Sequence, residues 1–306
     1  MRNCVNNPRK QIKRGLIALV ILLACYTALC FLLAWGTVCR KSKEMTRKPA
    51  DFGLRYEAVR FTSADGTELR GWLIPPDGRA KGVIIGCHGV DSTKMALLKP
   101  AKMLHHAGYA VLLFDFRARG ESGGERSTLG FRETDDLLAA VAFLQSRSDC
   151  GRLPIGVLGE SMGGAVALMG TARCPAIRCV IAESPFARLD HAIENHFSAV
   201  LGWGGPLLGV PTRWMGERLL GKNAAEIAPV SEIARIAPRP ILLIADNDDR
   251  LCPPSETDLL LEAAGQPIQL WTARNAGHIG AKTAQPTAYE RRIINFFDAG
   301  LSAGSH

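Results

Sequence analysis

Short apolar runs alternate with helix-forming stretches through most of this chain, and this alternation restricts the possible fold more than any other feature. Two extended segments come first, at residues 54–62 and 68–74, joined by the turn Ala64-Asp65-Gly66. The later apolar runs predict strands over residues 82–87, 109–114, 153–158, 179–182, 240–245 and 268–272. The stretches between and after them predict helices over residues 94–106, 133–145, 164–169, 256–264 and 288–297. Antiparallel strands followed by repeated strand–helix units predict an α/β fold, with a mostly parallel sheet and helices on both faces.

The pentapeptide Gly159-Glu160-Ser161-Met162-Gly163 lies between one predicted strand and the helix that follows it. A serine at a tight strand-to-helix turn is held in a strained conformation. The turn presents its hydroxyl above the sheet edge, beside the N-terminus of the helix. A G-x-S-x-G match alone is common by chance in a chain with 31 glycines. The assignment of Ser161 as a nucleophile therefore depends on partner residues elsewhere in the chain.

A serine nucleophile needs a base within hydrogen-bond reach, and the base needs an acidic partner. In folds with this turn the acid follows the serine and the histidine comes last. His278 lies in a loop after the last predicted strand and is the expected base. His191 and His196 lie earlier, in a long segment between strands, and are expected on a helix surface.

Three aspartates follow the predicted strand at residues 240–245. Asp246 is so close to the strand end that it could cap a turn, and Asp249 is expected to be a solvated turn residue. Asp248 precedes Leu251-Cys252-Pro253-Pro254 at a spacing that lets the loop fold back toward the histidine. Asp248 is the predicted acid, with Asp246 as the alternative.

An oxyanion hole needs two backbone N–H donors aimed at the developing negative charge. One donor is expected from Met162, which follows the serine at the start of the helix. The second is expected from Val90, in the loop Cys87-His88-Gly89-Val90 after an early strand, where Gly89 allows close approach of the backbone. His88 precedes the serine in the chain, so it is expected to be a structural loop residue.

These motifs together resemble the α/β-hydrolase superfamily over roughly residues 55–300. The resemblance rests on His88-Gly89, residues 115–122 (DFRARGES), the Ser161 pentapeptide, Asp248 and Gly277-His278. Within the superfamily the chain looks most like the membrane-anchored, serine aminopeptidase-like (S33) or Bem46-like branch, which implies a hydrolase. Ala245 and Cys252 depart from the glycine and proline common in relatives, and they leave the choice among the aspartates open. The resemblance implies a structural role for Arg117 and Arg119.

Residues 15–39 form a 25-residue stretch without a charged side chain, bracketed by basic residues. As a helix it would be about 37 Å long, at about 1.5 Å per residue, and a bilayer core needs about 20 residues. An uncleaved signal anchor is favoured over a cleaved signal peptide or a lipoprotein signal ending at Cys25. The flanks are nearly equal in charge, with a lean to a cytoplasmic N-terminus and the catalytic domain outside. The predicted organisation is a basic tail (1–14), the anchor (15–39), a basic tether (40–53) and a hydrolase domain (54–300).

Charge and cysteine content exclude several other classes of protein. The net charge is +8, but residues 1–50 hold ten Lys and Arg against a single acid, Glu44. The remainder is nearly neutral, so nucleic acid is not an expected partner. Five of the nine cysteines lie in the predicted domain, an odd number that excludes complete pairing; Cys174 and Cys179 could pair, although free thiols are favoured. No Cys/His spacing typical of a metal site is present, and neither a metal nor a cofactor is expected.

Residues 184–239 contain no predicted strand and interrupt the alternation. So long an excursion within a domain is typical of a lid or subdomain, and its apolar, glycine-rich character suits a cap over an apolar pocket. An ordinary helical insertion packed on the core is the alternative.

The leading functional hypothesis is a membrane-tethered serine hydrolase. It would cleave the ester or thioester of a small, lipophilic acyl substrate through an acyl-enzyme, with residues 15–39 in a lipid bilayer. A peptidase or an acyltransferase on the same fold is the alternative, and a non-catalytic binding or scaffold protein is a remote one.

Overall fold

The fold is that of a computed structural model, which describes residues 8–39, 41–42 and 44–302. Residues 1–7 of the predicted basic tail and residues 40 and 43 of the predicted tether lie outside the described residues.

An eight-stranded sheet forms the centre of the molecule, in the order β10-β9-β8-β7-β4-β5-β3-β2. Its strands are β2 (Glu57–Thr62), β3 (Glu68–Ile74), β4 (Val83–Cys87), β5 (Ala110–Phe114), β7 (Ile155–Glu160), β8 (Ile177–Glu183), β9 (Ile241–Asp246) and β10 (Ile268–Ala273). The six strands from β10 to β5 run parallel, whereas β3 pairs antiparallel with both β5 and β2. The predicted hairpin therefore forms one edge of a mostly parallel sheet, and the predicted α/β fold class is confirmed.

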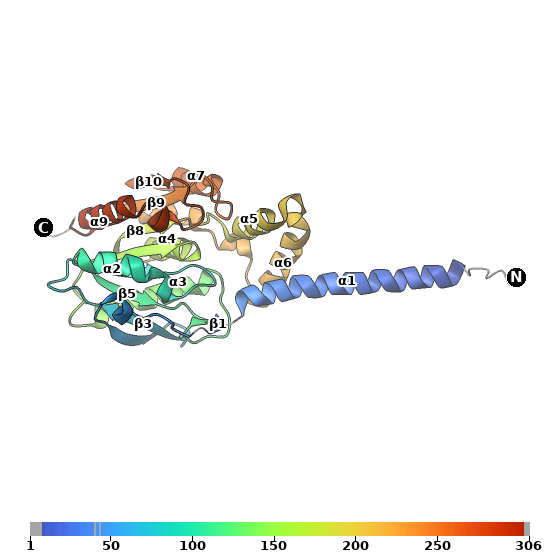
Figure 1. Ribbon diagram of the computed structural model, residues 1–306, viewed down its shortest axis with the longest axis horizontal. Coiled ribbons are helices and arrows are strands. Elements are labelled where there is room, and N and C mark those ends of the chain that lie inside the picture. Colours follow the sequence, from blue (N-terminus) through green and yellow to red (C-terminus); the bar gives the residue numbers. More distant parts are fainter. Residues whose placement is uncertain (1–7, 40, 43, 303–306) are drawn as a thin grey trace.

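Helices cover both faces of this sheet (Figure 1). The α-helices are α1 (Pro8–Val38), α2 (Leu98–His106), α3 (Phe131–Ser146), α4 (Met162–Arg173), α5 (Leu189–Leu201), α6 (Gly205–Leu220), α7 (Pro254–Ala263), α8 (Ala281–Ala284) and α9 (Pro286–Ser302). Short 3-10 turns occur at Pro49–Phe52, Lys94–Leu97, Gly202–Gly204, Ala224–Glu226, Pro229–Ser231 and Ile233–Ile236. A two-residue strand, β1 (Lys41–Ser42), pairs with β6 (Arg119–Gly120) outside the main sheet.

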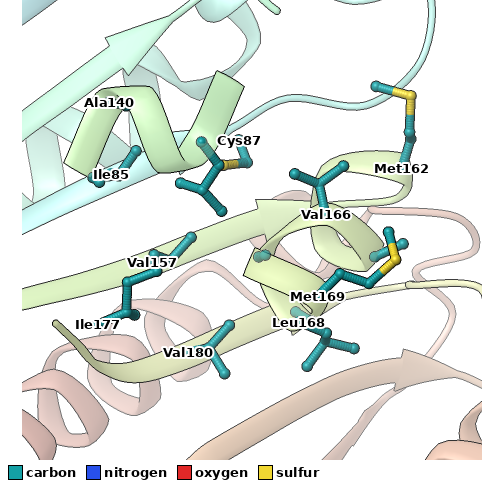
Figure 2. Close-up of a cluster of buried hydrophobic side chains, with 14 of the residues drawn as sticks. Ile85, Cys87, Ala140, Val157, Met162, Val166, Leu168, Met169, Ile177 and Val180 are labelled. Atoms are coloured by element: carbon teal, nitrogen blue, oxygen red, sulfur yellow. The ribbon is translucent and has the colours of Figure 1, made fainter. Parts of the chain in front are cut away.

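Alternation along the strands divides the buried side chains into two cores. In β4, Ile85 faces the core that includes helix α4, while its neighbour Ile84 faces the core that includes Phe297 of α9. Figure 2 shows the first core, where Val157 of β7 and Val166 of α4 belong to one apolar cluster. Both faces of the central strands are buried, which is why these strands are apolar runs rather than alternating polar and apolar residues.

Helix α1 projects from the domain, and its C-terminal part lies beside α6 (Figure 1). Among the described residues it is the one helix long and apolar enough to cross a membrane, over Arg9–Val38, by length and composition alone. The same test is met by a signal sequence.

Residues 184–239 contain the α5–α6 helical hairpin followed by three of the 3-10 turns, and no strand is found among them. Their role as a cap is taken up below. All cysteines in the described part of the chain are free thiols, Cys174 and Cys179 included.

Candidate active site

Ser161 occupies the sharp turn between β7 and α4. Its backbone has φ 55° and ψ −122°, in a region that a residue with a side chain rarely adopts. The turn is held on both sides: the Ser161 N–H donates to the Glu183 carbonyl oxygen at 2.8 Å, and the Ser161 carbonyl accepts from Gly164 N at 2.8 Å. The strained serine is thus fixed between the sheet and the first turn of α4.

The two glycines of the pentapeptide are required by close backbone packing. A Cβ atom on Gly159 would lie 2.2 Å from the Gly163 carbonyl oxygen, and one on Gly163 would lie 2.2 Å from the Cys87 carbonyl oxygen. Because the colliding atoms are backbone, no side-chain rotation relieves either clash. The motif therefore reflects the contact of the turn with itself and with the end of β4.

The structure brings Ser161 and His278 together, as the sequence predicts. His278 Nε2 lies 2.8 Å from Ser161 Oγ, and His278 Nδ1 lies 2.8 Å from Asp249 Oδ2. An ionised Asp249 accepts a hydrogen bond from Nδ1, so the proton of a neutral imidazole resides there. Nε2 is then free to accept from the serine hydroxyl, which is the arrangement a general base requires.

Asp249 is buried and well supplied with hydrogen-bond donors. Its Oδ1 accepts from the backbone N–H groups of Leu251 and Cys252, both at 2.9 Å. Burial alone would raise the pKa of this carboxyl, but the hydrogen bonds from His278 and from the Cys252 N–H outweigh burial and lower the pKa below its ordinary value. Asp249 is therefore ionised at neutral pH.

The prediction of Asp248 as the acid is wrong. Asp248 is exposed, and the aspartate facing His278 is its neighbour. The reason is a tight turn in which Asp249 N donates to the Asp246 carbonyl oxygen at 3.2 Å, which directs the Asp249 side chain inward. The signal available in the sequence was Leu251-Cys252, an apolar pair whose N–H groups an aspartate two or three residues earlier can bind in an Asx-type turn.

Asp246, the alternative, is also buried but has a different task. Its Oδ1 accepts from Asp248 N at 2.7 Å, and its Oδ2 accepts from Ala276 N at 2.9 Å. Asp246 thus joins the loop that carries Asp249 to the loop that carries His278.

The two residues predicted for the oxyanion hole both border the cavity in front of Ser161. Met162 is the first residue of α4, where backbone N–H groups have no intrahelical acceptor. Val90 follows Gly89, and a Cβ atom on Gly89 would lie 3.3 Å from Ser161 Cβ. The loop therefore passes directly beside the serine.

His88 holds this loop from behind. It is fully buried, its Nε2 accepts from Phe116 N at 3.1 Å, and its Nδ1 therefore carries the proton donated to the Gly89 carbonyl oxygen at 2.7 Å. Burial lowers the pKa of His88, so the ring is neutral. These contacts agree with the structural role expected for it.

Relatives identify the family. The sequence profile of the family "Serine aminopeptidase, S33" matches residues 78–232. The uncharacterised protein YqkD of Bacillus subtilis is 33% identical over 241 residues, which are 77% of this chain and 77% of YqkD. The chain belongs to the serine aminopeptidase (S33) family. The uncharacterised protein YfhR of Escherichia coli K12 is 29% identical over 80% of this S33 chain and 82% of its own length.

Solved structures agree with the family. The esterase Pf2001 of Pyrococcus furiosus has a TM-score of 0.73 and 29% identity, covering 87% of this S33 chain and 98% of the esterase. The α/β hydrolase GrgF of Penicillium sp. sh18, with a TM-score of 0.66 and 21% identity over 81% of this chain and 100% of GrgF, shares the fold. Membership of the α/β-hydrolase superfamily is confirmed, and the chain is an enzyme of the serine hydrolase class. The Bem46-like branch stays a prediction.

A cavity of about 400 Å³ opens in front of the Ser161 hydroxyl of this S33 hydrolase. Its walls come from the Gly89–Val90 loop, from the loops that carry Cys252 and His278, from α5 and α6, and from the end of α1. The lining is mainly apolar, a character typical of sites for small organic ligands.

One group of possible metal ligands occurs among the described residues, away from this cavity. Ligand atoms of the exposed Asp77 and His106 and of the buried His105 lie within 4.8 Å of one another. His105 Nδ1 already contacts the Pro75 carbonyl oxygen at 2.8 Å. None of the three residues lines the cavity of the S33 site.

A buried cluster of charged groups behind Ser161 was not predicted from the sequence. Glu160, the second residue of the pentapeptide, pairs with Lys282 of α8, and Glu183 at the end of β8 accepts from Ala281 N at 3.1 Å. Burial raises the pKa of both carboxyls, that of Glu183 to about 7. The cluster ties α8, just beyond His278, to the strands that hold the serine.

The raised pKa of Glu183 predicts a pH-dependent contribution to stability. The folded state binds this proton more tightly than the unfolded chain does, so the contribution is complete below the ordinary pKa of 4.5 and is lost as pH rises through about 7. We expect Glu183→Gln to remove this loss of stability, which is at most about 3.5 kcal/mol at about 1.4 kcal/mol per pKa unit. The Tm of Glu183→Gln should therefore increase relative to the Tm of the wild type as the pH of the thermal unfolding experiment rises. A difference in Tm that is constant over this range would contradict the assignment.

Proposed function

We propose that this chain is a membrane-anchored serine hydrolase that cleaves carboxylic ester or thioester bonds through an acyl-enzyme. The observation that carries the proposal is the hydrogen-bonded series from Ser161 Oγ through His278 to the buried Asp249. The strained backbone of Ser161 supports it, because such strain clusters at active sites.

In the proposed reaction, Ser161 Oγ attacks the carbonyl carbon of the substrate while His278 Nε2 accepts the hydroxyl proton. The N–H groups of Val90 and Met162 stabilise the resulting oxyanion. Its collapse breaks the bond to the leaving alcohol or thiol, which takes the proton from His278, and leaves an ester on Ser161. Water, deprotonated by His278, then releases the acid and restores the serine. Asp249 stabilises the imidazolium at both stages.

The membrane part of the proposal is supported by α1, whose length and apolar composition suit a span. We propose that the N-terminus lies in the cytoplasm and that the hydrolase domain lies on the other side of the membrane.

The α5–α6 hairpin is proposed as a cap, since both helices contribute walls to the cavity in front of Ser161. An ester is the favoured substrate because the similar Pf2001 protein is named an esterase and because the cavity is apolar.

Turnover of p-nitrophenyl esters of graded chain length by the full-length chain in detergent tests this function. We expect these esters to be hydrolysed faster than the matching p-nitroanilides. The product should be the free acid, even when an added alcohol competes with water for the acyl-enzyme. Faster turnover of the anilides would indicate a peptidase, and acyl transfer to the added alcohol would indicate an acyltransferase. The absence of any turnover would contradict the proposal.

A further inference from the structure

The C-terminal end of α1 forms part of the active-site cavity. Ala34, Thr37 and Val38 line the same cavity as Ser161 and His278. Ala34 and Val38, with Cys30 one turn earlier, are buried. Residues spaced by four lie on one face of a helix, and α1 packs against α6. The proposed membrane anchor is therefore also a wall of the catalytic cavity.

This wall is fastened to the hydrolase domain. The guanidinium of the buried Arg119 donates to the carbonyl oxygens of Thr37, at 2.8 Å, and Cys39, at 3.0 Å. Thr37 belongs to the last turn of α1 and Cys39 directly follows the helix, so neither carbonyl has an intrahelical donor. Ser127 N donates to the Val38 carbonyl oxygen at 2.8 Å. The end of α1 thus keeps a fixed position relative to Ser161, unlike a helix on a loose tether.

The α5–α6 hairpin carries a second uncharged run beside α1. Residues 197–212, at the tip of the hairpin, include no charged side chain. Large apolar side chains are exposed there, among them Trp203, with 95% of its surface accessible, and Val200, Leu201, Leu207 and Val210. An exposed apolar patch of this kind indicates a protein or membrane contact.

The position of the hairpin along α1 identifies the bilayer as the occupant of this patch. If the apolar layer begins at Gly15, a span of about 20 residues ends near Ala34. Tyr26 then lies within the layer, and its hydroxyl donates to the Leu207 carbonyl oxygen of α6. On this placement Leu207 lies at a depth within the apolar layer, and the exposed apolar side chains of the tip are close to it in sequence.

We propose that α1 and the α5–α6 hairpin together form an acyl site at the edge of the bilayer, and that the substrate is a lipid ester whose chain enters the cavity from the bilayer. This inference rests on the proposed function and adds the substrate class and the route of entry. The carbonyl of the lipid reaches Ser161 while its chain lies along Ala34, Thr37 and Val38.

Labelling of the full-length chain in phosphatidylcholine vesicles tests the acyl site. Two fluorophosphonates are compared, one with an ethyl group and one with a hexadecyl chain, and the ratio of the hexadecyl to the ethyl labelling rate is measured. A tryptophan in place of Ala34, or of the more exposed Thr37, narrows the cavity beside α1. We expect Ala34→Trp and Thr37→Trp each to lower the ratio by about tenfold or more, the effect of roughly 1.4 kcal/mol of lost chain binding.

Ala28→Trp is the matched control, because Ala28 is exposed on α1 and does not line the cavity. It should keep the wild-type ratio. A wild-type ratio in Thr37→Trp would overturn the acyl site even if Ala34→Trp were poorly folded. Failure of the wild type to react with the ethyl probe would instead contradict the proposed function, so the two failures are distinguishable.

Quenching of tryptophan fluorescence by brominated phosphatidylcholine tests the insertion of the hairpin. We expect the intensity quenched in the wild type to exceed that in Trp203→Phe, because Trp203 would be in contact with the lipid chains. Equal quenched intensity in the two proteins would mean that the tip is in water or covered by a second copy of the chain, and would overturn this part of the proposal.

Discussion

Asp249→Asn is expected to lower kcat for p-nitrophenyl butyrate by about 10⁴-fold, the loss seen when a triad aspartate is replaced by its amide. An amide nitrogen facing His278 Nδ1 would reverse the hydrogen bond, leaving the proton on Nε2, where it blocks acceptance from Ser161. Asp248→Asn is the matched control. Asp248 is exposed, and its contact with Asp246 is made by its backbone N–H. The kcat of Asp248→Asn should therefore stay within about twofold of the wild type.

The comparison of these two variants separates the structural assignment from the sequence-based one. Thermal unfolding of both proteins shows whether each is folded before kinetics are compared. A large loss in Asp248→Asn together with a small one in Asp249→Asn would contradict the geometry at His278.

Ser161→Ala is expected to have the largest effect of any single substitution, with kcat falling by about 10⁶-fold, as in serine hydrolases that lose their nucleophile. The alanine side chain lacks the oxygen that forms the acyl-enzyme, while the turn and the cavity remain. Ester turnover in detergent measures the loss. Ser146→Ala, at the exposed end of α3, is the control and should retain wild-type turnover. Residual turnover above about one per cent in Ser161→Ala would indicate a different nucleophile.

Much of the fold follows from the spacing of apolar runs, because parallel strands buried on both faces leave a strong signal. The Ser161 turn and His278 were also predictable, since a strand-to-helix turn and the order of the triad along the chain restrict where each can lie. The acid was not predicted. The sequence does not distinguish among three aspartates within four residues. The backbone turn decides which of them points toward the histidine.

The role of α1 in the cavity was likewise beyond the sequence analysis. Hydropathy indicates whether a helix can span a bilayer, but it does not show which face of the helix packs against another helix. The small residues Cys30 and Ala34, spaced by four with Val38, were a signal for such a face in hindsight. Arg119 was expected to be structural, and it donates to the carbonyl oxygens of Thr37 and Cys39 at the end of α1. Because Arg119 is far from α1 in the sequence, this contact could not be predicted.

Peptide mass spectrometry of the fluorophosphonate adduct identifies the nucleophile of this hydrolase, which we propose is Ser161. The full-length wild-type chain is labelled, digested and searched for the residue that carries the phosphonyl group. We expect a single modified residue, Ser161, and no adduct in Ser161→Ala. An adduct on any other residue of the wild type, or labelling that persists in Ser161→Ala, would contradict this proposal.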